Sequence, residues 1–248
     1  MLIYQYSGEL DGFLSAVFRI YQEKTVPDLL TDGELCESPL FSDLITVHPE
    51  EEKALRVEKG IYARLGISGL HQLSYAYASS DPERNRKLLY WILSVFKYGN
   101  DVQKRHHDPN VTECCDMTAK VTTEIHRMLG FLRFSQSRGG IYCAEFSPDN
   151  NVLPFIMHHF VHRFGDQPFL ILDVKRNLCG IYNCEEWKIV TPDKKISVLL
   201  SEREQVFQDL WKTYFRSVSV ASRENRKLQD SYLPRRYRAF LTEFQTLD

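Results

Sequence analysis

The spacing of apolar residues changes at about residue 131, and this change limits the fold more than any other feature of the sequence. Before it, apolar residues recur every three to four positions, which predicts helices between about residues 50 and 130. After it, short segments rich in β-branched and aromatic residues flank one stretch of helical spacing. The expected order is therefore strand, strand, helix, strand, strand, with strands at residues 131–136, 141–146, 168–174 and 178–184.

Each pair of predicted strands is separated by a few turn-forming residues, Ser137–Gly140 in the first pair and Lys175–Asn177 in the second. Both pairs are therefore predicted hairpins. Two hairpins joined by a helix favour an α+β fold with a mainly antiparallel sheet over a doubly wound parallel one. Residues 186–190 are expected to add an edge strand.

The rest of the chain is expected to pack around this sheet. Residues 2–6 predict a strand, residues 10–24 a helix and residues 25–42 a loop. Ser201 and Glu204 have the spacing of a capping box, which predicts the start of a long helix. No repeat or low-complexity linker divides the chain. We therefore expect a single composite domain with a helical region at about 50–130, a sheet core at about 131–190, and C-terminal helices with a basic tail at about 199–244.

Charge is distributed unevenly along the chain. The formal net charge of −2 excludes a globally basic nucleic-acid binder, but residues 223–238 contain six basic and two acidic residues. A local basic patch attracts phosphate even when the total charge does not. Tyr232 and Tyr237 lie within this patch, and aromatic rings can stack on bases. The alternative is a solvated helix face with no ligand.

The six cysteines contain no C-x-x-C pair, so we expect no structural zinc, no iron–sulfur cluster and no other metal or cofactor. The N-terminus lacks the pattern of a signal peptide, and no apolar run reaches the ~18–20 residues of a membrane span. We expect a cytoplasmic protein with reduced thiols and no membrane contact. Motifs for P-loops, dinucleotide sites, α/β-hydrolases and zincins are absent from the sequence.

His126, His159 and Asp173 are the candidates for acid–base chemistry. A histidine titrates near neutral pH, and a carboxylate can orient its ring. His126 borders the apolar stripe of its helix, so a histidine that only completes the core is the alternative. His158 and His162 have a spacing that can chelate a metal, but without an acidic partner they fit an exposed polar face better.

Arg133 lies within the first predicted strand, on the same sheet face as Phe131 and Ser135. There it could bind phosphate or form an ion pair with Asp173, and both alternatives stay open. Asp173 and Arg176 could also serve only to form the turn between two strands.

Short motifs occur along almost the whole chain, and the closing ones are the most specific. They are Tyr6-Ser7-Gly8 with Gly12-Phe13, Glu124-x-His126 with Gly130-Phe131-Leu132-Arg133-Phe134, Tyr142-x-Ala144, Pro148-Asp149-x-Asn151 with Leu153-Pro154, His159-Phe160-x-x-Arg163-Phe164-x-Asp166, Asp173-x-x-Arg176, Arg223-x-Asn225-x-x-Leu228-Gln229, Leu233-Pro234-x-Arg236-Tyr237 and Leu241-Thr242-Glu243. In these motifs the chain resembles a bacterial family of unknown biochemical function that is assigned to DNA metabolism or DNA repair.

The resemblance implies a partner, because relatives of this kind are associated with a radical-SAM protein assigned to DNA repair or modification. Some relatives are also joined to a domain similar to uracil-DNA glycosylases. The resemblance therefore implies work on DNA, by association. The candidate nucleic-acid contacts are Arg133, Arg163, Arg176, Arg226, Arg235, Arg236 and Tyr237.

Three functions follow as hypotheses. The first is a protein that binds DNA or a repair partner through basic residues, which needs the tail arginines on one exposed face. The second is an enzyme acting on a modified nucleobase, which needs His126, His159 and Asp173 in one pocket. The third is a subunit without catalytic activity that positions the radical-SAM partner, which needs an exposed apolar patch.

Overall fold

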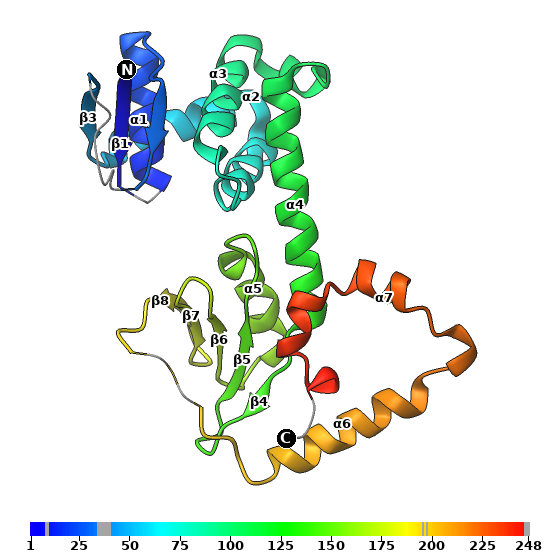
Figure 1. The fold of residues 1–248 in the computed structure, drawn as a ribbon. Helices are drawn as coiled ribbons and strands as arrows, with labels where there is room; N and C mark the ends of the chain where they lie inside the picture. The colour runs from blue at the N-terminus through cyan, green and yellow to red at the C-terminus, as the bar shows by residue number, and fades with distance from the viewer. Residues whose placement is uncertain (8–9, 34–40, 195, 197, 246–248) are drawn as a thin grey trace. The chain divides into compact units, whose positions relative to one another are not determined.

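The predicted first strand and helix are present as β1 (Leu2–Tyr6) and α1 (Leu10–Glu23) (Figure 1). The computed structural model describes residues 1–7, 10–33, 41–194, 196 and 198–245, so Gly8 of the first motif and part of the predicted loop at 25–42 lie outside the described residues. The chain divides into two compact units, residues 1–122 and 123–248, and the division falls inside α4 (Pro109–Phe131). The single composite domain stays a prediction, because this division does not decide whether either unit folds alone.

The first unit contains a parallel three-stranded sheet in the order β2-β1-β3. β1 pairs in parallel with β2 (Leu29–Thr31) and with β3 (Asp43–Val47). β2 lies where the sequence predicted only a loop. That local expectation was wrong because the backbone of β1 offers hydrogen-bonding groups on both edges, and a short apolar segment can satisfy one of them.

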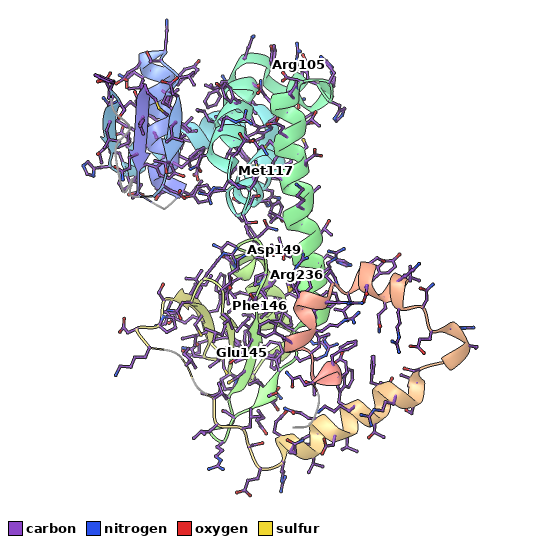
Figure 2. All side chains as sticks on the ribbon, viewed as in Figure 1. Arg105, Met117, Glu145, Phe146, Asp149 and Arg236 are labelled. Atoms are coloured by element: carbon purple, nitrogen blue, oxygen red, sulfur yellow. The ribbon has the colours of Figure 1, made fainter. Side chains whose placement is uncertain are left out.

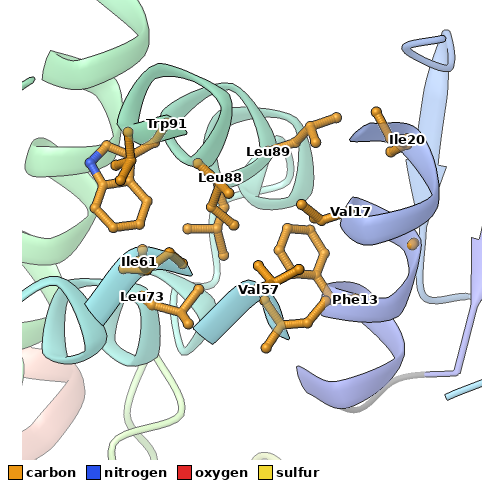
Figure 3. Packing of buried hydrophobic residues seen from close by; sticks show 14 of the residues in the cluster. Phe13, Val17, Ile20, Val57, Ile61, Leu73, Leu88, Leu89 and Trp91 are labelled. Atoms are coloured by element: carbon orange, nitrogen blue, oxygen red, sulfur yellow. The ribbon is translucent and has the colours of Figure 1, made fainter. Parts of the chain in front are cut away.

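The helical core of the same unit follows from the spacing of its apolar residues. α2 (Glu51–Tyr77) and α3 (Arg84–Tyr98) contribute Ile61, Leu88 and Trp91, each at most 1% exposed, and α1 contributes Phe13 (Figure 3). A 3₁₀ helix, η1 (Gly99–Lys104), leads toward α4. The predicted helical region therefore forms, and the buried apolar stripes explain why.

The second unit contains a five-stranded sheet in the order β4-β5-β6-β7-β8. Its elements follow the predicted order of strand, strand, helix, strand, strand. They are β4 (Ser135–Gln136), β5 (Tyr142–Phe146), α5 (Leu153–Phe164), β6 (Phe169–Asp173) and β7 (Leu178–Tyr182), and β8 (Trp187–Val190) adds the predicted edge strand.

Taken over both sheets, the described strands are not mainly antiparallel as predicted, because the first sheet is parallel and the second is mixed. β5 and β6 are parallel neighbours, while β4–β5, β6–β7 and β7–β8 are antiparallel. The reason is that α5 carries the chain back to the end of the sheet at which β5 begins. β6 therefore starts at the same end as β5 and runs parallel to it. With the parallel sheet of the first unit, the fold is a mixed α/β structure.

Two local predictions also fail near the second sheet. The first strand is shorter than expected, because Leu132 N still donates to Met128 O in the last turn of α4, so Arg133 lies between helix and strand. The expected capping box is absent: Glu204 accepts a hydrogen bond from Gln136 N across to β4, and Arg203 stands at the N-cap. The hydrogen bond between Gln136 and Glu204, which are distant in sequence, has replaced the local bond of a capping box.

The C-terminal segment consists of helices joined by short connections. It contains α6 (Glu204–Val218), η2 (Ala221–Arg223), α7 (Arg226–Tyr232), η3 (Arg235–Phe240) and η4 (Thr242–Phe244), drawn in orange to red in Figure 1. Within the described ranges of the chain, no helix is both long and apolar enough to cross a membrane.

The close packing of α5 on the sheet predicts that Gly180 does not tolerate a larger residue. A Cβ at this position in β7 would overlap Sδ of Met157 and lie 3.2 Å from Cδ1 of Leu153. We expect Gly180→Val to lower the free energy of unfolding by about 1–3 kcal/mol, measured by urea denaturation.

Gly130→Ala is the matched control. A Cβ at Gly130, in α4, meets no atom within 4 Å, and alanine favours a helix over glycine. This variant is expected to be neutral or more stable by up to ~1 kcal/mol. An equal loss of stability in both variants would contradict the packing argument.

Candidate functional site

The loop at residues 147–152 joins the carboxyl end of β5 to α5, beside the carboxyl end of the parallel strand β6. In open α/β sheets, ligands often bind at this edge, where two parallel strands end. In this protein, side chains from three other segments reach the loop. They form a network of carboxylates and guanidinium groups.

Glu124 of α4 is the buried centre of this network, with 4% of its surface exposed. One carboxylate oxygen accepts hydrogen bonds from Asp149 N at 2.7 Å and from the hydroxyl of Tyr237 at 2.5 Å. The other accepts from the backbone N and the side-chain Nδ2 of Asn150, at 2.8 and 2.7 Å. Four donors thus compensate the loss of water around a buried charge.

Asp173 and Arg176 hold the same loop from the other side. Asp173 is fully buried at the end of β6, and its carboxylate accepts from Arg176 Nη1 at 3.0 Å and from two backbone N–H groups of the following turn. The guanidinium of Arg176 also donates to the backbone oxygens of Pro148 and Asp149. The turn that the sequence predicted is present, and its Arg176 also binds the backbone of the loop at residues 147–152.

Arg236 and Tyr237 bring the C-terminal segment to this network. Arg236 Nη2 lies 2.7 Å from a carboxylate oxygen of Asp149, and Figure 2 shows the two side chains beside each other. The same nitrogen donates to the hydroxyl of Tyr237, which is buried. Burial and the hydrogen bond to Glu124 raise the pKa of Tyr237 above its ordinary value, so its hydroxyl stays protonated and donates. The network therefore fixes η3 to the sheet.

A second ion pair fixes the end of the same segment. Arg133 binds Glu243 through two nitrogens, with Nη2 at 2.7 Å and Nε at 3.1 Å from the two oxygens. Trp211 Nε1 of α6 donates to the same carboxylate at 3.0 Å. Arg133 is thus paired with Glu243, and the alternative of an ion pair with Asp173 was wrong because Asp173 is bound by Arg176.

An arginine-lined groove of about 1000 Å³ lies along the C-terminal segment. Among the residues that the structure describes, five arginines and two acids line it, together with Phe215 and Phe244. The charged lining residues are Arg216, Arg223, Arg226, Arg235, Arg238, Glu224 and Asp230.

The charges of the groove are only partly paired. Asp230 accepts from both Arg235 and Arg238, and the hydrogen bond from Arg235 in particular lowers the pKa of Asp230. Arg226 pairs with Glu224 on the exposed surface, where such pairs are weak. Within the described part of the chain, Arg216 and Arg223 have no carboxylate at ion-pair distance. The groove therefore has a positive surface.

The family described as "Domain of unknown function (DUF4130)" matches residues 82–243. The chain belongs to this family. The matched range includes the network around Glu124, the Arg133–Glu243 pair and all five groove arginines. No curated protein matches the chain.

Within the DUF4130 range, the sequence-predicted residues fall into separate groups. Arg176, Arg236, Tyr237 and Asp173 meet in the network, and Arg226 and Arg235 line the groove. His126, His159 and Arg163 have exposed side chains on α4 and α5. In the described residues, no hydrogen bond joins either histidine to Asp173. The acid–base role of His126, His159 and Asp173 stays a prediction.

The histidines and cysteines that the structure describes do not gather into a larger cluster. His158 and His162 approach through ring nitrogens 3.0 Å apart on the surface of α5. Over the described ranges, no group of three or more possible metal-ligating side chains occurs.

Sequence reasoning missed the roles of Glu124, Asp149 and Glu243 and the groove arginine Arg216, whereas Arg223 and Arg238 belong to the predicted basic patch at residues 223–238. A usable signal existed, because Glu124, Asp149, Arg223 and Glu243 all belong to the motifs of the family resemblance. The spacing of residues along the chain could not predict their contacts, since the hydrogen-bonded partners of Glu124 lie 25, 26 and 113 positions away in the sequence.

Glu124→Gln tests whether the network supports the fold. An amide would direct a donor N–H group at donors that now share a carboxylate, so we expect a loss of about 2–4 kcal/mol in the free energy of unfolding. Glu145→Gln is the control, because Glu145 of β5 is exposed. A loss below ~0.5 kcal/mol for Glu124→Gln would contradict this role.

The Arg133–Glu243 pair predicts a pH dependence. Burial would raise the pKa of Glu243, but hydrogen bonds from Arg133 and Trp211 outweigh it and lower the pKa below its ordinary value. The ionised form therefore stabilises the fold above the unfolded-state pKa of about 4.3, and this contribution is lost as the pH falls through the lowered pKa.

Unfolding of wild type and Glu243→Gln between pH 3 and pH 7 measures this effect. Wild type is expected to be more stable at pH 7, with the difference shrinking toward pH 3. A difference that stays constant over this range would contradict the assignment.

Proposed function

We propose that this protein acts in DNA repair or DNA metabolism by binding DNA through the arginine-lined groove. The observation that carries the proposal is the groove itself, in which five arginines face two acids. Guanidinium groups bind phosphates through several N–H donors, and their charge displaces the counterions of the DNA backbone.

The pairing of the groove residues supports a phosphate ligand. Arg216 and Arg223 line the groove without a carboxylate partner among the described residues, so a phosphate would not have to displace an internal ion pair there. Arg226 and Arg235 are 87% and 80% exposed at their side chains despite their ion pairs. Phe215 and Phe244 add aromatic surface to the same groove, which suits stacking on an unpaired base.

The network around Glu124 prepares this surface for binding. Arg236 and Tyr237 anchor η3, and the neighbouring Arg235 and Arg238 of the same 3₁₀ helix line the groove. A groove whose wall is fixed before binding loses less conformational entropy on binding. Arg176, Arg236 and Tyr237 thus contribute to the proposed function as anchors, and Arg226 and Arg235 as phosphate contacts.

The assignment to DNA, and the partnership with a radical-SAM protein, rest on the family resemblance. The groove supports only the more general part of the proposal, which is the binding of a polyanion. Among the described residues, no hydrogen bond joins His126 or His159 to Asp173, so the acid–base alternative rests on the sequence alone.

Fluorescence anisotropy with labelled single- and double-stranded DNA over a salt series tests the proposal. We expect Arg223→Glu/Arg226→Glu to weaken binding at least about tenfold at low salt, and to reduce the slope of log K against log salt by roughly 1.4–1.8. These two side chains are exposed, so the fold should be retained.

Lys188→Glu/Lys194→Glu is the matched control, because it changes the net charge equally at exposed positions outside the groove. Equal weakening by both double variants would show that only total charge matters. Absence of salt-dependent binding by the wild-type chain would contradict the proposal.

A further inference from the structure

A small cavity of about 180 Å³ lies among α1, α2 and α3 of the first unit. Phe18 and Tyr21 of α1, Phe96 of α3 and the buried Val57 of α2 line it. Tyr21 packs edge-on against Phe96, with 5.3 Å between the ring centroids. Much of the wall is therefore aromatic and aliphatic carbon, which suits a flat apolar group.

Two arginines of α2 complete the lining of this cavity. Arg56, Gly60 and Arg64 recur every four residues ahead of the kink at Gly66, so they lie along one face of the helix. Gly60 lets the ring of Phe96 approach this face, because a Cβ at Gly60 would lie 3.0 Å from Cε1 of Phe96. The two arginines thus have an aromatic surface between them.

Aromatic rings hold both guanidinium groups in place. Cζ of Arg56 lies over the ring of Phe18, 5.0 Å from its centroid, and Cζ of Arg64 lies over the ring of Phe96 at 5.1 Å. Arg64 Nη1 also donates to Gly60 O at 2.8 Å. A guanidinium stacked on a ring keeps N–H donors at its edge, and it loses less conformational entropy when an anion binds there.

The charge of the two guanidinium groups is not neutralised locally. Within the described ranges, no acidic residue lines the cavity, and no carboxylate lies at ion-pair distance from Arg56 or Arg64. Two unpaired positive charges beside an apolar wall favour an anion, and arginine binds a carboxylate through two parallel hydrogen bonds.

We propose that this cavity binds a small aromatic carboxylate, that is, a single ring carrying one acidic group. The ring would lie against the aromatic wall, and the carboxylate would accept N–H groups of Arg64, with Arg56 adding the second positive charge. The size of the cavity supports a single ring, because about 180 Å³ is well below the ~300–1000 Å³ of pockets that enclose drug-sized ligands.

This site is separate from the arginine-lined groove of the proposed function. All of its lining residues belong to the first unit, and Phe96 alone of them falls within the range that matches the DUF4130 family. The proposal therefore stands or falls independently of DNA binding.

A titration of the full chain with 4-fluorobenzoate, followed by fluorine NMR, tests the proposal. We expect a dissociation constant on the order of 0.1–1 mM, as befits a ligand with few atoms. 4-Fluorobenzamide has the ring without the charge, and acetate has the charge without the ring. Each should bind at least about tenfold more weakly than 4-fluorobenzoate, because each lacks one of the two contacts.

Substitutions in the cavity locate the binding. Arg64→Gln should weaken 4-fluorobenzoate binding at least about tenfold and Arg56→Gln at least about threefold, through loss of a charged hydrogen bond and of a nearby charge. Tyr21→Ala, which keeps both charges, should weaken it by a similar factor to Arg56→Gln. All three side chains are exposed, so the fold should be retained, which circular dichroism checks.

Lys59→Gln is the matched control, because it removes one positive charge at an exposed position of α2 outside the cavity. It should leave the affinity for 4-fluorobenzoate unchanged. Absence of wild-type binding at about 10 mM ligand, or equal weakening by Lys59→Gln and Arg64→Gln, would overturn the proposal. Tighter binding of adenosine monophosphate or N-acetylphenylalanine than of 4-fluorobenzoate would overturn the assignment to a small acid.

Discussion

The carboxylate of Glu124 is the interaction on which the second unit depends. A buried negative charge is costly unless donors replace the lost water, and here three N–H groups and one hydroxyl do so. The donors come from the loop after β5 and from η3, which are far apart in sequence. Glu124 is therefore a structural carboxylate, and its four hydrogen bonds leave little capacity for a substrate proton.

This arrangement explains how the C-terminal segment keeps a defined shape. α7 has seven residues and η2 has three, and isolated helices of this length are marginal in water. The segment is held at its beginning by Glu204 on β4, and toward its end by Tyr237 on Glu124 and Glu243 on Arg133. Anchors at both ends place the groove arginines on one surface. The positive groove is thus a product of buried polar contacts some distance from it.

The predicted residues divide according to this logic. Arginines that the sequence presents as equivalent have different surroundings: Arg133 and Arg176 bind internal carboxylates, whereas Arg223 lies exposed in the groove. In α6, too, the sequence pattern does not show which side chains are buried. Its spacing correctly indicates an amphipathic helix, but Glu204 and Gln208 share the internal contacts with Trp211 and Phe215, while Val206, Leu210, Tyr214 and Val218 stay exposed.

The sequence by itself determined the helices of the first unit, the order of elements around the second sheet, and the basic character of the tail, because these depend on local spacing and composition. Only the tertiary structure decided that β5 and β6 run parallel, that Arg133 pairs with Glu243, and that Glu124 joins the loop at 147–152 to η3. These features depend on contacts between residues distant along the chain. A local pattern shows that a charge or an apolar face needs a partner, and the folded chain determines which partner it finds.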